Sequence, residues 1–311
     1  MGLPIFLAVV LTAPLPASAA AVECGQVITS SITLQEDLTC ATGDGLVVGA
    51  ANVQIDLNGH QILVEGSDGN PAVGVRNAGY PRLSIQNGRV LSFDAGPAIL
   101  ITGAVNNKVT DVEAWGWIEA GVKVVDSSRI LLRGNDLDGD SRGLWMVNTS
   151  DSVIRDSKLA ASNFGSAAVI TGDRNRLTGN EITNSGDSRG LVLTGNQNAV
   201  IDNTIHSNDP HGATIAGNGN VVRRNVVSAN GTPTSPGYGV QITGEGGLVD
   251  GNQLNANFGD GLRVTGSIIV RNNVANDNTG WGILAAAGAH DGGGNTATGN
   301  LAGQCSNISC S

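Results

Sequence analysis

The sequence predicts an all-β solenoid, in which short parallel strands stack into a coil of about 22 residues per turn. Three observations support this fold class. Glycines recur at intervals of mostly 21 to 24 residues, each glycine opens a segment that alternates apolar and variable residues, and asparagine recurs at one point of the repeat. Helical repeats need a 3.6-residue rhythm and helix-forming residues, and these segments have neither.

The repeat unit begins with glycine, an apolar residue, a variable residue and a second apolar residue. This alternation is typical of a strand with one buried face. Two earlier units, near residues 46–66 and 73–93, share the rhythm more loosely, and Ala167 opens a further unit. Together the units predict roughly ten coils. The glycines that define them are Gly121, Gly143, Gly190, Gly212, Gly239, Gly261 and Gly282.

An asparagine recurs in a second short segment, about eight residues after each strand begins. Identical amides stacked in register can hydrogen-bond along the coil axis, as they do in cross-β stacks. They can also satisfy turn backbone groups that would be costly to bury unpaired. We therefore interpret this column as structural. Its members in the sequence are Asn135, Asn180, Asn203, Asn225, Asn252, Asn272 and Asn295.

The two ends of the chain predict export and disulfide-bonded caps. Residues 1–19 combine an apolar run with an Ala-Ser-Ala cleavage pattern, which indicates a signal peptide. We expect a β-helix domain over 20–304, with an N-terminal cap at 20–44, and a C-terminal disulfide cap at 305–311. The cysteines pair naturally as Cys24 with Cys40 and Cys305 with Cys310. The alternative is a metal site made from all four.

Charge and composition restrict the partners. The net charge is −10, from 17 basic and 27 acidic residues, so duplex nucleic acid is excluded as an expected partner. A polyanionic substrate would need a local basic groove that overrides the global field. After residue 19 there is no apolar run long enough to span a membrane. We expect a secreted or periplasmic protein, monomeric, with polysaccharide as its partner.

Two N-terminal segments carry a resemblance to a known architecture. NVQIDLNGHQI (52–62) and CGQVITSSITLQEDLTC (24–40) are similar to the first coils of secreted bacterial β-helix repeat proteins. With the 22-residue repeat, the chain resembles the right-handed parallel β-helix of the pectate-lyase-like superfamily. This implies a right-handed parallel β-helix solenoid with disulfide-bonded ends, whose ligands lie across the face of the first strand. The architecture hosts lyases, epimerases, hydrolases and non-catalytic surface proteins, so it does not fix an activity.

A candidate site follows from the repeat register. Stacked coils place equivalent residues side by side, so polar residues at one repeat position should form a row along the first-strand face. Three positions contribute: the outward side of the strand, the residue before each glycine, and the residue two places upstream. These residues are Lys123, Trp145 and Arg263, then Arg142, Arg189, His211, Tyr238 and Trp281, then Asp187 and Asp209.

This row suits removal of the C5 proton of a uronate sugar. A cation such as Arg189 or Arg142 would withdraw charge from the carboxylate, His211 would act as base near neutral pH, and Tyr238 as acid. A lyase gives the proton to the leaving oxygen, whereas a C5-epimerase returns it to the opposite face of the ring. The segment NDPHG (208–212) also resembles the Asp/His turns of mannuronan C5-epimerases, which implies that Asp209 and His211 are cleft residues.

Other interpretations remain open. Asp-x-Arg pairs are ordinary turn residues, His211 could be a solvated turn histidine, and Tyr238 could pack under the insertion TPTSP (232–236). Trp115 and Trp117 could fill a widened core. Few cations fall on the face, which favours the alternative of a non-catalytic carbohydrate-binding or cell-surface protein. The repeats also suggest a periplasmic accessory protein in metal-enzyme maturation.

Metal and cofactor signals are weak in the sequence. The four histidines are scattered and show no close His/Cys spacing, so we predict no metal site of the zinc or copper type. Scattered Asp and Asn oxygens leave Ca²⁺ as the one cofactor still open. There is no phosphate loop and no nucleophile elbow.

Overall fold

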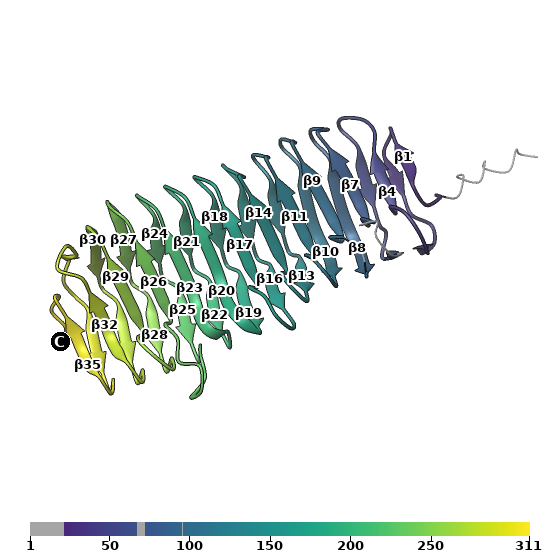
Figure 1. The fold of residues 1–311 in the computed structure, drawn as a ribbon. Coiled ribbons are helices and arrows are strands. Elements are labelled where there is room, and N and C mark those ends of the chain that lie inside the picture. The colour runs from purple at the N-terminus through teal and green to yellow at the C-terminus, as the bar shows by residue number, and fades with distance from the viewer. Residues whose placement is uncertain (1–21, 67–71, 95) are drawn as a thin grey trace, which may run out of the picture.

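The computed structural model describes residues 22–66, 72–94 and 96–311, and these form strands and turns with no helix (Figure 1). Successive coils stack side by side into an elongated rod that runs from one end of the chain to the other. All strand pairings are parallel, between strands one coil apart. The predicted right-handed parallel β-helix is therefore confirmed, and the predicted signal peptide at 1–19 lies outside the described residues.

One long sheet, here called sheet A, takes one strand from every coil. It contains thirteen strands, and its pairings follow the order of the chain. The strands are β1 (Gln26–Ile28), β4 (Leu46–Val48), β7 (Val75–Ala78), β9 (Ile99–Thr102), β11 (Val122–Val125), β14 (Leu144–Val147), β17 (Ala168–Thr171), β20 (Asp187–Thr194), β23 (Asp209–Ala216), β26 (Val240–Thr243), β29 (Leu262–Thr265), β32 (Trp281–Ala285) and β35 (Gly303–Ser306).

Two further sheets close the coil. Two long strands, β8 (Ser84–Phe93) and β10 (Lys108–Gly116), run through both of them. Sheet B also contains β2 (Ile32–Thr33), β5 (Gln54–Asp56), β12 (Leu131–Arg133), β15 (Val153–Arg155), β18 (Arg176–Thr178), β21 (Ala199–Ile201), β24 (Val221–Arg223), β27 (Gly247–Asp250), β30 (Ile268–Arg271) and β33 (His290–Asp291). Sheet C also contains β3 (Leu38–Cys40), β6 (Gln61–Glu65), β13 (Asp136–Gly139), β16 (Lys158–Ala161), β19 (Glu181–Ser185), β22 (Thr204–His206), β25 (Val226–Ser228), β28 (Gln253–Asn255), β31 (Val274–Asn276) and β34 (Thr296–Thr298).

The number of coils is larger than predicted. The rod has about 12 turns, against the roughly ten expected. The units counted from the sequence leave out three strands of sheet A: the first strand β1, the last strand β35, and β9, which follows Ala98 instead of a glycine. The two looser units that were counted hold Leu46 and Val75, which pair in register in sheet A.

The core is a set of aliphatic columns, one from each sheet. In sheet A the inward column includes Leu144, Ala168 and Leu191, which are all fully buried. Alternating residues point outward, as the period-2 pattern requires. Stacked small aliphatics thus fill the interior, which explains how a chain with 3% aromatic residues builds a continuous core.

Buried asparagine ladders line the turns. In the turn between sheets B and C, the Asn203 side chain donates to Asn225 Oδ1 at 3.0 Å, and its backbone N–H donates to the same oxygen at 2.9 Å. The predicted column is correct except for one member. Asn273, not Asn272, lies in the ladder, while Asn272 adopts a left-handed backbone (φ 54°) and donates to Asp250.

Two more ladders were not predicted. One joins Asn175, Asn198 and Asn220 between sheets A and B. The other runs between sheets C and A and ends on a glutamine side chain; it contains Asn208, Asn230, Asn257, Asn278, Asn300 and Gln304. Each amide satisfies buried backbone groups that the turns would otherwise leave unpaired.

Both predicted disulfides are present. Cys24 bonds Cys40 at the first coils, and Cys305 bonds Cys310 at the last. The described residues contain no free cysteine, which excludes the alternative four-cysteine metal site. They also contain no helix of the length and hydrophobicity needed to cross a membrane.

Candidate functional site

Sheet A aligns the outward side chains in the expected register. Lys123 pairs with Trp145 on the next strand, and five strands later Arg263 pairs with Leu284. Strands β20 and β23 begin before the repeat glycine and extend the pairing to the turn. Asp187 therefore lies beside Asp209, and Arg189 beside His211. Parallel stacking thus brings residues 22 positions apart into direct contact.

Four side chains stack across β23, β26 and β29 at the start of these strands. The rings of His211 and Tyr238 are parallel, with centroids 4.5 Å apart and an angle of 8°. The Arg263 guanidinium lies over the Tyr238 ring, 4.4 Å from its centroid. Its Nη1 donates to Tyr238 Oη at 2.9 Å. Asp260 accepts from Arg263 Nε at 3.2 Å and Nη2 at 3.0 Å.

Asp260 fixes this stack from below the surface. Asp260 is 6% exposed, and its Oδ1 accepts the backbone N–H of Trp281 at 2.8 Å. The sequence showed Asp260 before a repeat glycine, but did not identify it as a site residue. Only the structure shows that Asp260 is buried beside Arg263, and this contact identifies it as a site residue.

His211 is held in one tautomer. Its Nδ1 accepts the backbone N–H of Tyr238 at 3.0 Å, so the neutral ring carries its proton on Nε2. Burial lowers the pKa of His211, Arg189 and Arg263 lower it further, and Asp209 opposes them. The ring is neutral near pH 7, with its acceptor nitrogen occupied. This geometry disfavours the predicted base role and leaves His211 as a hydrogen-bond donor through Nε2.

Two polar groups near His211 lack partners. Asp209 Oδ1 is buried without a hydrogen bond, and Oδ2 receives only a 3.5 Å contact from the Thr232 hydroxyl. Thr214 Oγ1, on the same strand as His211, is also buried and unpaired. The Arg189 guanidinium makes no hydrogen bond or ion pair with the described residues. These groups are available for a ligand at this end of the row.

The other predicted residues form a separate cluster. The Trp145 ring lies between two cations, with Lys123 Nζ 4.1 Å and Arg142 Cζ 4.3 Å from its centroid. Lys123 is paired with Glu119, and Arg142 Nε is buried without a partner. Three strand steps separate Trp145 from the His211 strand, which is about 14 Å at the usual strand spacing. The row is therefore one face with two clusters.

The structure contradicts the interpretation that Trp115 and Trp117 are core residues. Trp115 and Trp117 do not fill a widened core, because Trp115 occupies an outward position of β10 and Trp117 is 43% exposed. Trp281 stays in the row and packs over Gly303, where an added Cβ would lie 2.3 Å from its ring.

The residues do not build a metal centre. Within the described ranges no three His, Cys, Asp or Glu side chains gather where they could hold an ion. His60, His206 and His290 bond Asp37, Glu181 and Ser267 respectively, on different coils. Met146 is fully buried in the core, and Met1 lies outside the described residues. Copper and zinc favour His, Cys and Met ligands, so this donor set does not fit them.

Comparisons with known proteins agree with the fold. A family model described as "Right handed beta helix region" matches residues 166–309, and one described as "Periplasmic copper-binding protein (NosD)" matches residues 41–236. A comparison with curated proteins found no match.

Solved structures with the same fold include two epimerase modules. The A-module of Azotobacter vinelandii mannuronan C-5 epimerase AlgE6 aligns with a TM-score of 0.66 at 14% identity, covering 91% of both chains. The AlgE4 A-module gives 0.64 at 12% identity with the same coverage. The Dettilon tailspike protein gives 0.51 at 14%, covering 90% of this chain and 60% of its own. At these identities the similarity shows a common fold.

Proposed function

This chain belongs to the family described as periplasmic copper-binding protein (NosD), and we propose that it acts on an acidic polysaccharide, a polyuronate, by abstracting the C5 proton of a uronate residue. The family and the two disulfides point to an extracytoplasmic protein. One observation carries the proposal: His211, Tyr238, Arg263 and Asp260 form a single connected stack on the outward face of sheet A. Mannuronan epimerase modules share this fold, and we extend their substrate class to this chain.

The contacts within the stack assign roles to its members. Tyr238 Oη accepts from the Arg263 guanidinium, which also lies over its ring, and we assign Tyr238 the role of base because this cation stands beside the oxygen that would receive the proton. A phenolate can take the C5 proton, which reverses the acid role predicted from the sequence. His211 donates from Nε2, and the unpaired Arg189 beside it binds the uronate carboxylate and withdraws charge.

Either a lyase or an epimerase reaction can follow once the C5 proton has been removed. In a lyase, Tyr238 takes the C5 proton, the C4–O bond breaks, a C4=C5 double bond forms, and the new phenol gives its proton to the leaving oxygen. In an epimerase, a proton returns to C5 from the opposite face of the ring, and no bond of the chain breaks. The first route needs only Tyr238, whereas the second needs another donor across the sugar.

The test is proton exchange at C5. A panel of mannuronate, guluronate and galacturonate polymers is incubated with the protein in D₂O. Deuterium at C5 is read by NMR, and unsaturated uronate by ultraviolet absorbance. We expect Tyr238→Phe to lower turnover by about 10²–10⁴-fold, the usual contribution of a proton-transfer residue. Tyr80→Phe is the matched control, because its described contacts are made through its backbone near the other end of the rod.

Two results would contradict the proposal. One is a wild-type protein that produces neither exchange nor unsaturated product on any polymer. The other is equal turnover in Tyr238→Phe and Tyr80→Phe, since the stack would then have no part in the reaction.

A second candidate function is a non-catalytic carbohydrate-binding or cell-surface protein. The pairing of the cations favours it: Lys123 is bound to Glu119 and Arg263 to Asp260, which leaves only part of the row for a polyanion. Polysaccharide binding that survives in His211→Ala, with no turnover in either protein, would support this alternative.

The family description mentions copper, but the described residues of this chain do not supply a copper site. The histidines lie apart, the cysteines are oxidised, and Met146 is in the core. We therefore assign copper no step in the proposed reaction.

A further inference from the structure

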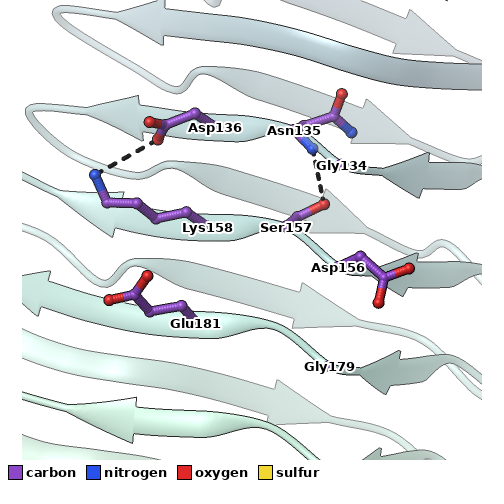
Figure 2. Close-up of a pocket in the computed structure, with 8 residues that line it drawn as sticks. All are labelled: Gly134, Asn135, Asp136, Asp156, Ser157, Lys158, Gly179 and Glu181. Atoms are coloured by element: carbon purple, nitrogen blue, oxygen red, sulfur yellow. Dashed lines mark hydrogen bonds and ion pairs between the residues drawn. The ribbon is translucent and has the colours of Figure 1, made fainter.

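A hollow lies on the outward side of sheet C, away from the stack on sheet A. It is lined by the starts of β13, β16 and β19 and has a volume of about 520 Å³ (Figure 2). Asp136, Lys158 and Glu181 stand in one column on these neighbouring strands, with Lys158 reaching toward Asp136. A smaller hollow of about 200 Å³ adjoins it and shares Asp136 and Lys158. We refer to these two adjacent hollows together as the depression.

One aromatic side chain, Trp115, lines this depression, and two other aromatic rings pack against it. Trp115 lines the smaller hollow and stacks on Trp117, with centroids 5.8 Å apart and an angle of 23°. Phe93 meets Trp115 edge-on at 5.1 Å. Three of the chain's ten aromatic residues therefore gather at one place on its surface. Flat indole surfaces of this kind stack on sugar rings and attract cations.

The indole nitrogen of Trp115 adds a polar requirement. Nε1 is buried and has no hydrogen-bond partner among the described residues. Buried donors in folded proteins normally have a partner, so an unpaired one indicates a missing acceptor. A ligand hydroxyl could supply it.

The charges around the depression are mostly negative. The smaller hollow is lined by three carboxylates, Glu113, Asp136 and Asp138, and by Lys158. Arg89 pairs with Glu113 through two contacts of 3.0 Å, which leaves Asp136 and Asp138 beside Lys158. The Asp136–Lys158 contact is long, at 3.7 Å. Burial raises the pKa of Asp136, Lys158 lowers it, and the neighbouring carboxylates Asp138 and Glu113 raise it. Two carboxylates beside one lysine leave a net negative charge, which favours a cationic ligand over a uronate.

We propose that the depression on sheet C binds a cationic amino sugar, a 2-amino-2-deoxyhexose with a free amine. The sugar ring stacks on Trp117 and Trp115, its ammonium group lies beside Asp136 and Asp138 of β13, and a hydroxyl accepts from Trp115 Nε1. The charge expected for this ligand is therefore opposite to that of the polyuronate proposed for sheet A. The proposal stands independently of the reaction on sheet A.

Titration with a glucosamine tetramer tests the site, using calorimetry and tryptophan fluorescence. We expect Trp117→Ala to weaken binding about fivefold, the equivalent of about 1 kcal/mol for an aromatic contact. Asp136→Asn should weaken it by a similar factor or more, and salt should weaken the wild type. Tyr80→Ala is the matched control, because it removes an exposed aromatic ring in the turn after β7, outside the lining of the depression, and should leave the affinity unchanged.

Ligand selectivity supplies the deciding comparison. The N-acetylated tetramer and a neutral glucose tetramer should bind at least tenfold more weakly. Equal affinity for all three would overturn the role of charge, and equal losses in Trp117→Ala and Tyr80→Ala would overturn the location. Circular dichroism checks that both variants fold. Failure of this binding leaves the C5-exchange test on sheet A unaffected, so the two proposals fail separately.

Discussion

Replacing Asn225 tests whether the asparagine ladder stabilises the rod. Its Nδ2 donates to the Val200 carbonyl and to Asn252 Oδ1, both at 2.9 Å, and its Oδ1 accepts the backbone N–H of Asn203 at 2.9 Å. The residue is 1% exposed, so water cannot replace these bonds. In Asn225→Ala the N–H of Asn203 loses this acceptor, and the Val200 carbonyl loses one donor.

The expected loss is about 3 kcal/mol. An orphaned buried polar group costs about 1–3 kcal/mol, and the lost amide–amide bond adds to it. Asn225→Ser should cost less, because Ser157 Oγ in the same ladder accepts the backbone N–H of Asn135 at 3.2 Å. A serine at 225 can accept the Asn203 N–H in the same way.

Equilibrium urea unfolding, followed by circular dichroism with the disulfides intact, measures the effect. A loss of about 3 kcal/mol should lower the midpoint by roughly 1 M for a chain of this size. Asn163→Ala is the control, because Asn163 is exposed and should shift stability by less than about 0.5 kcal/mol. Equal midpoints for Asn225→Ala and Asn163→Ala would refute the role given to the ladder.

Three further predictions concern the site. The pKa of His211 is lowered from 6.5 in the folded protein, so below that pH the unfolded chain binds more protons than the folded one. The free energy of unfolding should therefore fall as the pH drops through 6.5, and it should fall less in His211→Gln. Urea unfolding at several pH values measures both. Asp260→Asn should lower kcat at least tenfold by releasing Arg263 from Tyr238, whereas Asp202→Asn, on a surface ion pair, should not; an equal kcat in both would contradict the positioning role. Titration with Cu(I) or Cu(II), followed by equilibrium dialysis and metal analysis, should give no stoichiometric binding, and one tightly held ion per chain would show that the donor set was misjudged.

The sequence predicted sheet A more accurately than the rest of the fold. Most of its units are marked by a glycine and alternate apolar and variable residues, so the register from Lys123 to Leu284 followed from alignment alone. The asparagine column was displaced by one residue at Asn272 because two asparagines stand together there, and only the backbone decides which points inward. The other two ladders, which the sequence did not predict, are shorter runs of asparagine: Ser152 precedes Asn175 in one, and Ser185 precedes Asn208 in the other.

For the candidate site, the sequence predicted which residues are neighbours but not their hydrogen bonds. Stacking predicted that Arg189 and His211 lie side by side, because that depends only on the repeat period. The period does not determine where a side chain finds its hydrogen bonds. The Tyr238 N–H reaches His211 Nδ1 through an insertion that lengthens the coil, and this contact sets the tautomer. The roles of base and donor therefore required atomic positions.

The burial of Asp260 bears on the choice between a catalytic and a purely binding face. A carboxylate removed from water loses several kcal/mol of hydration, and replacing a buried ion pair by apolar residues often stabilises a protein. A rod that only needed stability, or an exposed surface for sugars, would gain little from such a pair. Here the pair holds Arg263 at the oxygen of Tyr238, which itself stacks on a histidine of fixed tautomer. That arrangement fixes charge before a ligand arrives, which proton abstraction requires and simple adhesion does not.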